Sequence, residues 1–241
     1  MFATQVAART LLIHRAWRYR LKVEPDEVAF LRRHLKRGHR AVDIGAHRGA
    51  LTYWMLKAVG PAGAVVAVEP IPGLADDLRL LGWRSFSTRL TVVEAALSNS
   101  SGHNTLFVPS DGYLGTATFV PQRVSHDRVS VTTTTLDELF GREPFQSIHF
   151  IKCDVEGHEL EVLRGAESVL RHDRPVLLVE SVDCRPALGQ TTRVFDYLQR
   201  LGYTGYFFMN GRTQPLADFR VDRHQIGPGT SWCVNFGFVP V

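Results

Sequence analysis

The chain has 241 residues, of which 44% are hydrophobic and 22% charged, values typical of a globular protein that buries a core without cross-links. Its formal net charge of +4 is too small to indicate a nucleic-acid-binding protein. No apolar run approaches the roughly 20 residues of a membrane span, so we expect no transmembrane segment. The three cysteines lie far apart without metal-ligand spacing, which predicts reduced thiols and a cytoplasmic location.

Residues 1–38 form a distinct N-terminal segment. The first 22 residues contain several arginines and no acid, which indicates an amphipathic basic helix. The stretch Pro25–Gly38 has apolar residues at helical spacing, acids in its first turn and bases in its last. We expect this segment to pack as helices on the domain formed by residues 39–241. A targeting segment or a peripheral contact with a membrane surface are the alternatives.

Strand-like and helix-like segments then alternate along the chain. The apolar runs AVDIG, AVVAVEP, LTVVEAAL, SIHFIKCDVEG and PVLLVES read as strands, and most are followed by an amphipathic helical pattern. This alternation predicts a doubly wound, mostly parallel sheet with helices on both faces. The runs around Tyr206 and Val234 are expected to form a final antiparallel hairpin.

The alternation is interrupted between residues 98 and 136. Two strand-like runs, NTLFVP and VSVTTTTL, flank the polar stretch 110–128, and we expect the threonine run to be an edge strand. A connection of that length without periodicity is usually functional, which predicts an acceptor-binding lid with Tyr113 and Phe119 as aromatic walls. The spacing of TLDE, at 135–138, is that of a capping box and predicts a short helix.

The carboxyl ends of the predicted strands indicate where a ligand binds, because doubly wound sheets bind ligands at that edge. Glycines at 45 and 49 allow the chain to turn sharply after the first strand and to approach a ligand closely. A dinucleotide fingerprint would need glycine at 47 and 50, where the chain has His47 and Ala50. The pyrophosphate of a dinucleotide is therefore disfavoured.

Two acids at this edge favour S-adenosylmethionine instead. Asp43 suits a cationic amine, directly or through water, and Glu69 follows Gly49 by 20 residues at the next strand end, where an acid accepts both ribose hydroxyls. The alternative is an ordinary strand-to-helix turn with an acidic cap. The expected cofactor-binding residues are Asp43, Gly45, Ala46, His47, Gly49, Glu69, Pro70, Ala95, Ala96, Ser98 and Asp154.

Four motifs follow one another along the chain: D-[VI]-G-A-[NH]-x-G at 43–49, E-P at 69–70, T-T-L-D at 134–137, and I-K-x-D-V-E-G-x-E-x-x-x-L-x-G at 151–165. Together they resemble the FkbM-type family of S-adenosylmethionine-dependent methyltransferases. The resemblance covers about Val42 to Glu180. It implies methyl transfer, usually to oxygen, on sugars, polyketides or related small molecules. Alternation and resemblance together predict a Rossmann-like class I methyltransferase sheet of seven strands.

A second acidic group is predicted at the end of the fourth strand. Lys152, Asp154 and Glu156 alternate and so share one face, where an acid can orient an acceptor hydroxyl and take its proton. Asp154 and Glu156 are weak candidates, with Glu180, for holding a divalent cation, which is possible but not required. The alternative is a structural role as helix caps paired with Lys152 or Arg164.

Other polar residues near these strand ends are weaker candidates. His158 opens the following helix and is a possible general base, so the expected catalytic set is Lys152, Asp154, Glu156 and His158. Ser98 and Asn99 are placed to reach the adenine or simply to form a turn. Cys153 is expected to be a buried, inert thiol.

The sequence therefore predicts an S-adenosylmethionine-dependent O-methyltransferase acting on a small-molecule or glycan acceptor, with no nucleic-acid partner. Two other classes stay open at this point. One is a nicotinamide-dependent oxidoreductase, which the missing glycine at 47 disfavours. The other is a non-catalytic Rossmann-like binding module, which the acids Asp43, Glu69, Asp154 and Glu156 disfavour.

Overall fold

The computed structural model describes residues 2–82, 89–110, 117–119, 126–141, 147–183, 189–225 and 232–241. The helices are α1 (Phe2–Arg18), the π-helix η1 (Tyr19–Val23), α2 (Pro25–His34), α3 (Ala50–Val59), α4 (Pro72–Gly82), α5 (Leu136–Phe140), α6 (Glu159–Arg164), α7 (Glu167–His172), α8 (Gln190–Arg200), the 3-10 helix η3 (Leu216–Asp218) and α9 (Val221–His224). The strands are β1 (Arg40–Ile44), β2 (Ala64–Val68), β3 (Leu90–Val93), β4 (Ala96–Leu97), β5 (Gly102–Pro109), β6 (His126–Thr134), β7 (Phe150–Cys153), β8 (Val176–Glu180), β9 (Tyr203–Met209), β10 (Arg212–Pro215) and β11 (Asn235–Pro240).

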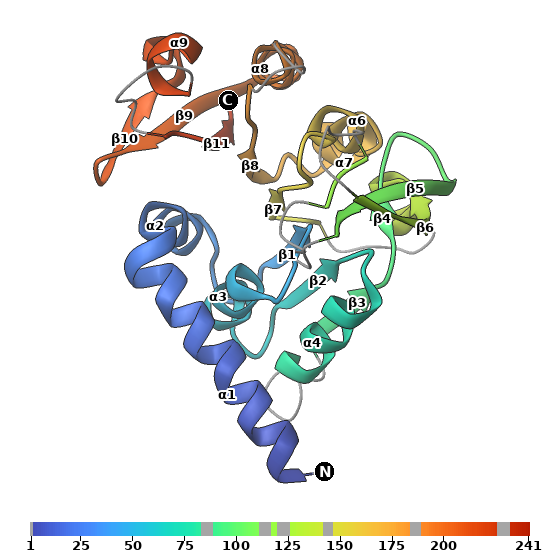
Figure 1. The fold of residues 1–241 in the computed structure, drawn as a ribbon. Helices are drawn as coiled ribbons and strands as arrows, with labels where there is room; N and C mark the ends of the chain where they lie inside the picture. Colours follow the sequence, from blue (N-terminus) through green and yellow to red (C-terminus); the bar gives the residue numbers. More distant parts are fainter. Residues whose placement is uncertain are drawn as a thin grey trace.

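The main sheet has the order β10-β9-β11-β8-β7-β1-β2-β3. The strands β3, β2, β1, β7 and β8 run parallel, and β11 pairs antiparallel with both β8 and β9. Helices α1–α3 lie toward one face of the sheet and α6–α8 toward the other (Figure 1). The predicted doubly wound α/β fold is confirmed.

The described part of the sheet has eight strands, where seven were predicted. The additional strand is β10, which forms a hairpin with β9 through Asn210 and Gly211, at φ 54° and 73°. Asn-Gly between two extended runs is the strongest short sequence signal for such a turn, so this strand was predictable. The expected antiparallel pairing of the last two runs is confirmed in the register Gly237 to Tyr206.

A second, three-stranded sheet contains the threonine run that the sequence predicts to be an edge strand. The predicted strand LTVVEAAL divides into β3, in the main sheet, and β4, in a sheet of order β4-β6-β5. The threonine run belongs to β6, which is the middle strand of that sheet, so the prediction of an edge strand is wrong. β6 carries alternately exposed and buried side chains, which explains how a polar run occupies a central position.

The N-terminal segment packs against the domain through a narrow apolar stripe. Leu12 and Ala16 are buried, and the Trp54 indole N–H donates a hydrogen bond of 2.8 Å to the Ala16 carbonyl. Helix α1 thereby lies against α3 and α4. It is continued without a break by the π-helix η1, which carries the chain past the carboxyl ends of the strands.

The first strand ends in a corner that only glycine fits. Gly45 has φ 70°, and a Cβ atom at this position would lie 1.8 Å from the carbonyl oxygen of Asp154. Gly49 has φ 73° and precedes α3, with Leu78 and Leu81 close to where its Cβ would be. The two glycines therefore bring the ends of β1 and β7 into backbone contact and start α3 at the ligand-binding edge.

We predict that Gly45→Ala lowers the free energy of unfolding by about 3 kcal/mol or more, because a left-handed conformation and an overlap with the Asp154 carbonyl both oppose the methyl group. Gly211→Ala is the matched control, since Gly211 has φ 73° and no atom within 4 Å of its Cβ position. The control should lose about 1–2 kcal/mol. Urea unfolding measures both, and equal losses would contradict the close approach at Gly45.

Candidate functional site

Glu69 follows β2 at the ligand-binding edge and is 4% exposed. Its carboxylate accepts hydrogen bonds from two backbone N–H groups, that of His47 at 2.9 Å and that of Ile71 at 3.0 Å. Burial raises the pKa of Glu69, while these two hydrogen bonds lower it. Each carboxylate oxygen keeps a further lone pair, so the side chain is fixed in place and still able to accept from a diol.

Lys152 lies at the centre of the strand ends and is 7% exposed. Its ammonium donates to the Gly45 carbonyl at 2.8 Å and lies 3.0 Å from an Asp154 oxygen and 3.7 Å from an Asp43 oxygen. Burial lowers the pKa of Lys152, but Asp154 and Asp43 outweigh burial, so its pKa lies above the ordinary value. Lys152 is therefore held in its charged form between Gly45, Asp154 and Asp43, and its predicted catalytic role stays a prediction.

Asp43 is almost completely buried, at 1% exposure. One of its oxygens accepts from the Thr52 hydroxyl at 2.5 Å, and the other has no hydrogen-bond partner among the described residues. Burial raises the pKa of this carboxyl, and Lys152 and Thr52 lower it. That second oxygen is buried and lies 3.7 Å from the Lys152 ammonium, so Asp43 contributes negative charge to the site.

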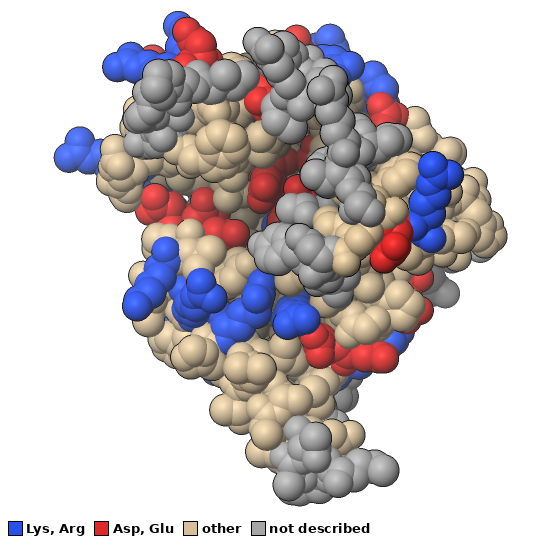
Figure 2. All heavy atoms as spheres, viewed as in Figure 1, with Lys and Arg blue, Asp and Glu red and all other residues tan. Residues whose placement is uncertain are grey.

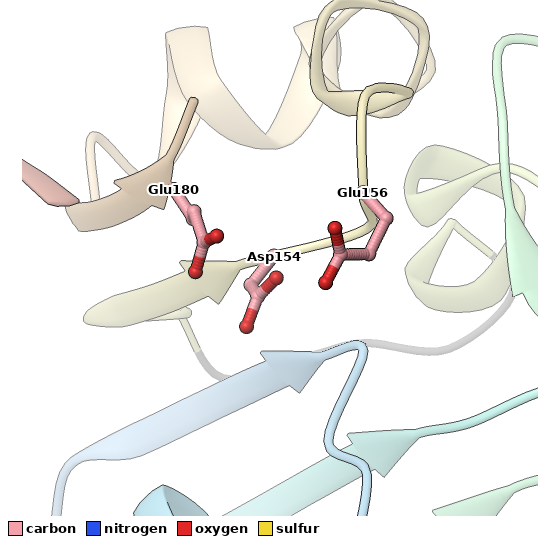
Figure 3. A group of neighbouring side chains, drawn as sticks. All are labelled: Asp154, Glu156 and Glu180. Atoms are coloured by element: carbon pink, nitrogen blue, oxygen red, sulfur yellow. The ribbon is translucent and has the colours of Figure 1, made fainter. Parts of the chain in front are cut away.

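Three carboxylates stand together beside Lys152. Asp154, Glu156 and Glu180 each have an oxygen within 4.8 Å of the others, and their side chains point toward one another from the ends of β7 and β8 (Figure 3). Burial, followed by the charge of Asp154, raises the pKa of Glu156 to about 8 and also raises the pKa of Glu180. This set offers only oxygen ligands, the type that Mg²⁺ and Ca²⁺ prefer.

The loop that carries Asp154 and Glu156 is held by a buried acid. Glu159 accepts hydrogen bonds from the N–H groups of Gly157 and Val155, at 2.9 and 3.3 Å, and from the Gln190 amide at 2.8 Å. Glu156 itself has φ 53°, a left-handed conformation that is costly for a residue with a Cβ. Its side chain is therefore aimed by the loop and not by local preference.

One cavity of about 660 Å³ is lined by Asp43, Glu69, Lys152 and the three clustered carboxylates. Figure 2 shows acidic side chains inside a hollow on this face and a row of Lys and Arg side chains along one rim. The volume lies in the range of pockets that hold small molecules and cofactors. The predicted site residues among its lining are Asp43, Gly45, Ala46, His47, Glu69, Pro70, Ala95, Ala96, Lys152, Asp154, Glu156 and Glu180.

A family model described as the methyltransferase FkbM domain matches residues 43–204 of this chain. The chain belongs to the FkbM methyltransferase family. The match begins at Asp43, on β1, and ends in β9, so it contains the glycine corner, Glu69 and the three clustered carboxylates. The resemblance found in the four sequence motifs is thereby confirmed.

Solved methyltransferases share the fold at low sequence identity. The methyltransferase FkbM from Methylobacillus flagellatus is 17% identical with a TM-score of 0.52, over 98% of this chain and 59% of that one. An O-methyltransferase from Bacillus cereus is 15% identical with a TM-score of 0.56, over 96% and 89%. Precorrin-6y C5,15-methyltransferase from Geobacter metallireducens is 13% identical with a TM-score of 0.50, over 90% and 87%.

The chain thus spans 59% of the length of the FkbM protein from Methylobacillus flagellatus. A search of curated proteins finds no match to the present chain. The differing names of the structural neighbours indicate that the shared fold does not fix which atom accepts the methyl group.

Several predicted residues of this FkbM-family chain lie outside the cavity lining. These residues are Gly49, Ser98 and His158. The Ser98 hydroxyl lies 2.9 Å from His158 Nε2. The His158 ring also meets the Phe119 ring at 4.8 Å, and burial lowers the pKa of this histidine. Ser98 and His158 thus contact each other, and His158 contacts Phe119, while their predicted cofactor and catalytic roles stay predictions.

The cavity has a wall that the sequence reasoning missed. Its residues Arg15, Tyr19, Glu24 and Glu27 come from the segment α1–α2, outside the family match, and Trp232 precedes β11. Burial raises the pKa of Glu24 to about 7, while Lys152 lowers it. No spacing in the sequence relates the four N-terminal residues to the strand ends, because the packing of α1 on α3 brings them there.

The predicted lid falls largely outside the described residues. This applies to 111–116 and 120–125, and so to Tyr113, whereas Phe119 is described and lines the cavity. The lid itself stays a prediction. Among the cysteines, Cys153 is free and buried, and burial raises its pKa well above the usual value, as expected for an inert thiol.

Within the described part of the chain, none of the helices combines the length and apolar character needed to cross a bilayer. Helix α1 and η1 nevertheless expose Leu11 and Leu21, at 67% and 65%, beside the exposed bases Arg18 and Lys22. Peripheral contact between this segment and a membrane surface stays a prediction.

The raised pKa of Glu156 predicts how stability depends on pH. The carboxyl binds its proton more tightly when folded, at a pKa of about 8 against 4.5, so its stabilising contribution is complete below pH 4.5 and is lost as the pH rises to about 8. In Glu156→Gln, the free energy of unfolding should fall less between pH 5 and 8 than in the wild type. Urea unfolding at several pH values measures this, with the exposed Glu94→Gln as control. Parallel curves for Glu156→Gln and wild type would contradict the shift.

Proposed function

We propose that this chain is an S-adenosylmethionine-dependent methyltransferase that transfers the methyl group to a hydroxyl oxygen of a small molecule or glycan. The observation that carries the proposal is that one cavity is lined by Glu69, which follows β2, and by the clustered carboxylates, which follow β7 and β8 on the other side of β1. In this proposal, Glu69 binds the ribose and the acids act on the acceptor. The family match supports methyl transfer, and the oxygen acceptor rests on the carboxylate chemistry.

The residues present fit the cofactor. Gly45 lets the chain turn sharply at the ligand-binding edge, and Glu69 keeps free lone pairs for the ribose diol. The Asp43 carboxylate, which lines the same cavity beside Lys152, adds negative charge that suits a cationic amine. When bound, S-adenosylmethionine supplies a methyl group on a cationic sulfonium. The acid-rich lining around Asp154 and Glu180 is electrostatically suited to that charge.

The proton of the acceptor hydroxyl needs a base. Glu156, whose pKa is raised to about 8, is partly deprotonated near neutral pH and closer in proton affinity to a hydroxyl than an ordinary carboxylate is. Asp154 is fixed against Lys152 at 3.0 Å and is suited to orienting the acceptor. A divalent cation held by Asp154, Glu156 and Glu180 would serve the same end by polarising the hydroxyl.

The two alternatives from the sequence gain no support. An oxidoreductase needs a pyrophosphate cradle, whereas this corner presents His47 with a lowered pKa of about 4 and the buried acid Asp43. A binding module without activity does not require three carboxylates close together at the strand ends. Asp154, Glu156 and Glu180 are such a group, and among the described residues only Asp154 has an ion-pair partner, Lys152.

For the cofactor, we predict that S-adenosylhomocysteine binds and that Glu69→Gln weakens it by about 1.5–3 kcal/mol, or roughly 10- to 150-fold in Kd, the range for a hydrogen bond to a charged group. The amide keeps one acceptor oxygen and loses the other. Isothermal titration calorimetry measures this, with Glu94→Gln as the exposed control. An unchanged Kd in Glu69→Gln would remove the ribose assignment.

For the chemistry, we predict that Asp154→Asn and Glu156→Gln fold and bind S-adenosylhomocysteine, and that at least one loses turnover by about 100-fold, the lower edge of what a positioned base contributes. Formation of S-adenosylhomocysteine during an acceptor screen gives the readout, and wild-type kcat should rise with pH toward about 8. Repetition with a chelator separates a direct base from a metal-held hydroxyl. Two folded variants with normal turnover would show that the pair is structural.

A further inference from the structure

Arg15 extends from α1 into the cavity beside the glycine corner. Its Nη2 atom donates to the Tyr19 hydroxyl at 2.9 Å and lies 3.3 Å from His47 Nδ1, and its guanidinium carbon stands 5.0 Å from the centre of the Tyr19 ring. Burial, followed by the charges of Arg15 and Arg48, lowers the pKa of His47 to about 4, so the imidazole is neutral. The arginine is thus held by two neutral partners.

The Arg15 guanidinium has no carboxylate partner among the described residues. Within the described ranges, no carboxylate lies within 4.0 Å of Arg15, and its Nε atom is buried without a hydrogen-bond partner. Removing a guanidinium from water without a counter-charge is costly. A ligand that brings an anionic group into the cavity would supply the missing counter-charge.

The other two Lys or Arg side chains among the described lining residues are already engaged. Lys152 is bound to the Gly45 carbonyl and to Asp154, and Arg48 pairs with Asp77 at 3.5 Å. Arg15 is therefore the lining cation left for an anion. It stands on the opposite side of His47 from Glu69, because the His47 backbone N–H donates to Glu69 while its ring faces Arg15.

The cofactor of the proposed function has one anionic group, the α-carboxylate of its amino-acid portion. If Glu69 binds the ribose, that portion extends from Glu69 past the corner, toward Asp43, Lys152 and Arg15, which all line the same cavity. The acids there suit the amine and the sulfonium. The carboxylate needs a cation, and a guanidinium binds a carboxylate in a two-pronged geometry.

We propose that Arg15, oriented by Tyr19 and His47, binds the α-carboxylate of S-adenosylmethionine, an inference that rests on the proposed function. The proposal makes α1 part of the cofactor site, although the family match begins only at residue 43. Arg15 would select ligands that keep the amino-acid portion over those that carry adenosine alone.

The test compares two ligands by calorimetry. S-Adenosylhomocysteine carries the carboxylate, and 5′-methylthioadenosine has the same nucleoside without the amino-acid group. In Arg15→Gln, we expect the Kd of S-adenosylhomocysteine to rise about 10-fold or more, and that of 5′-methylthioadenosine to change less than about 2-fold. Arg18→Gln, on the same helix and exposed, is the matched control and should leave both constants unchanged.

The other possible results overturn either the role of Arg15 alone or the proposed function as well. An unchanged Kd for S-adenosylhomocysteine, or equal losses for both ligands in a folded variant, would overturn the role of Arg15 and leave the proposed function intact. A wild-type protein that binds neither ligand would overturn the proposed function and this inference together. Should Arg15→Gln fail to fold, Tyr19→Phe keeps the ring and removes the hydroxyl that fixes Arg15, and a selective loss for S-adenosylhomocysteine is still expected.

Discussion

The buried ammonium of Lys152 is the interaction on which the arrangement of the site depends. It joins the carbonyl that ends β1 to the carboxylate that follows β7, with Asp43 close by. Without this cation, Asp43 and Asp154 would face one another and the neighbouring glutamates uncompensated, in a region where burial already raises carboxyl pKa values. Gly45 lets the two strand ends approach closely enough for one lysine to serve both.

From that centre the cavity divides into two electrostatic regions. On one side, Asp154, Glu156 and Glu180 share more negative charge than Lys152 neutralises, and the pKa values of Glu156 and Glu180 are raised. On the other side, Glu69 is satisfied by backbone N–H groups, and Arg15 stands with neutral partners. The first region suits proton transfer and the second suits holding a zwitterionic cofactor in a fixed orientation.

The sequence predicts the strand ends well because their positions follow from a topological rule. Once β1, β2, β7 and β8 are read as parallel, their carboxyl ends must meet, and the acids after each must share an edge. The contribution of Arg15 was not predictable in this way. Its place depends on Leu12 and Ala16 docking α1 on Trp54, a tertiary contact with no signature in local spacing. The same holds for Ser98 and His158, which lie near the strand ends but face each other instead of the cavity.

The residues proposed for the chemistry and the remaining lining residues come from different parts of the chain. The former lie in the matched region on rigid strand ends, where a displacement would disturb Lys152 and its partners. The remaining lining residues include Val23 of η1 and Trp232, which is 65% exposed, both outside the match, and Phe119 within the insertion. None of the three contacts the Lys152 ammonium, so under the proposed function acceptor preference is free to change at these positions without disturbing the Lys152 network.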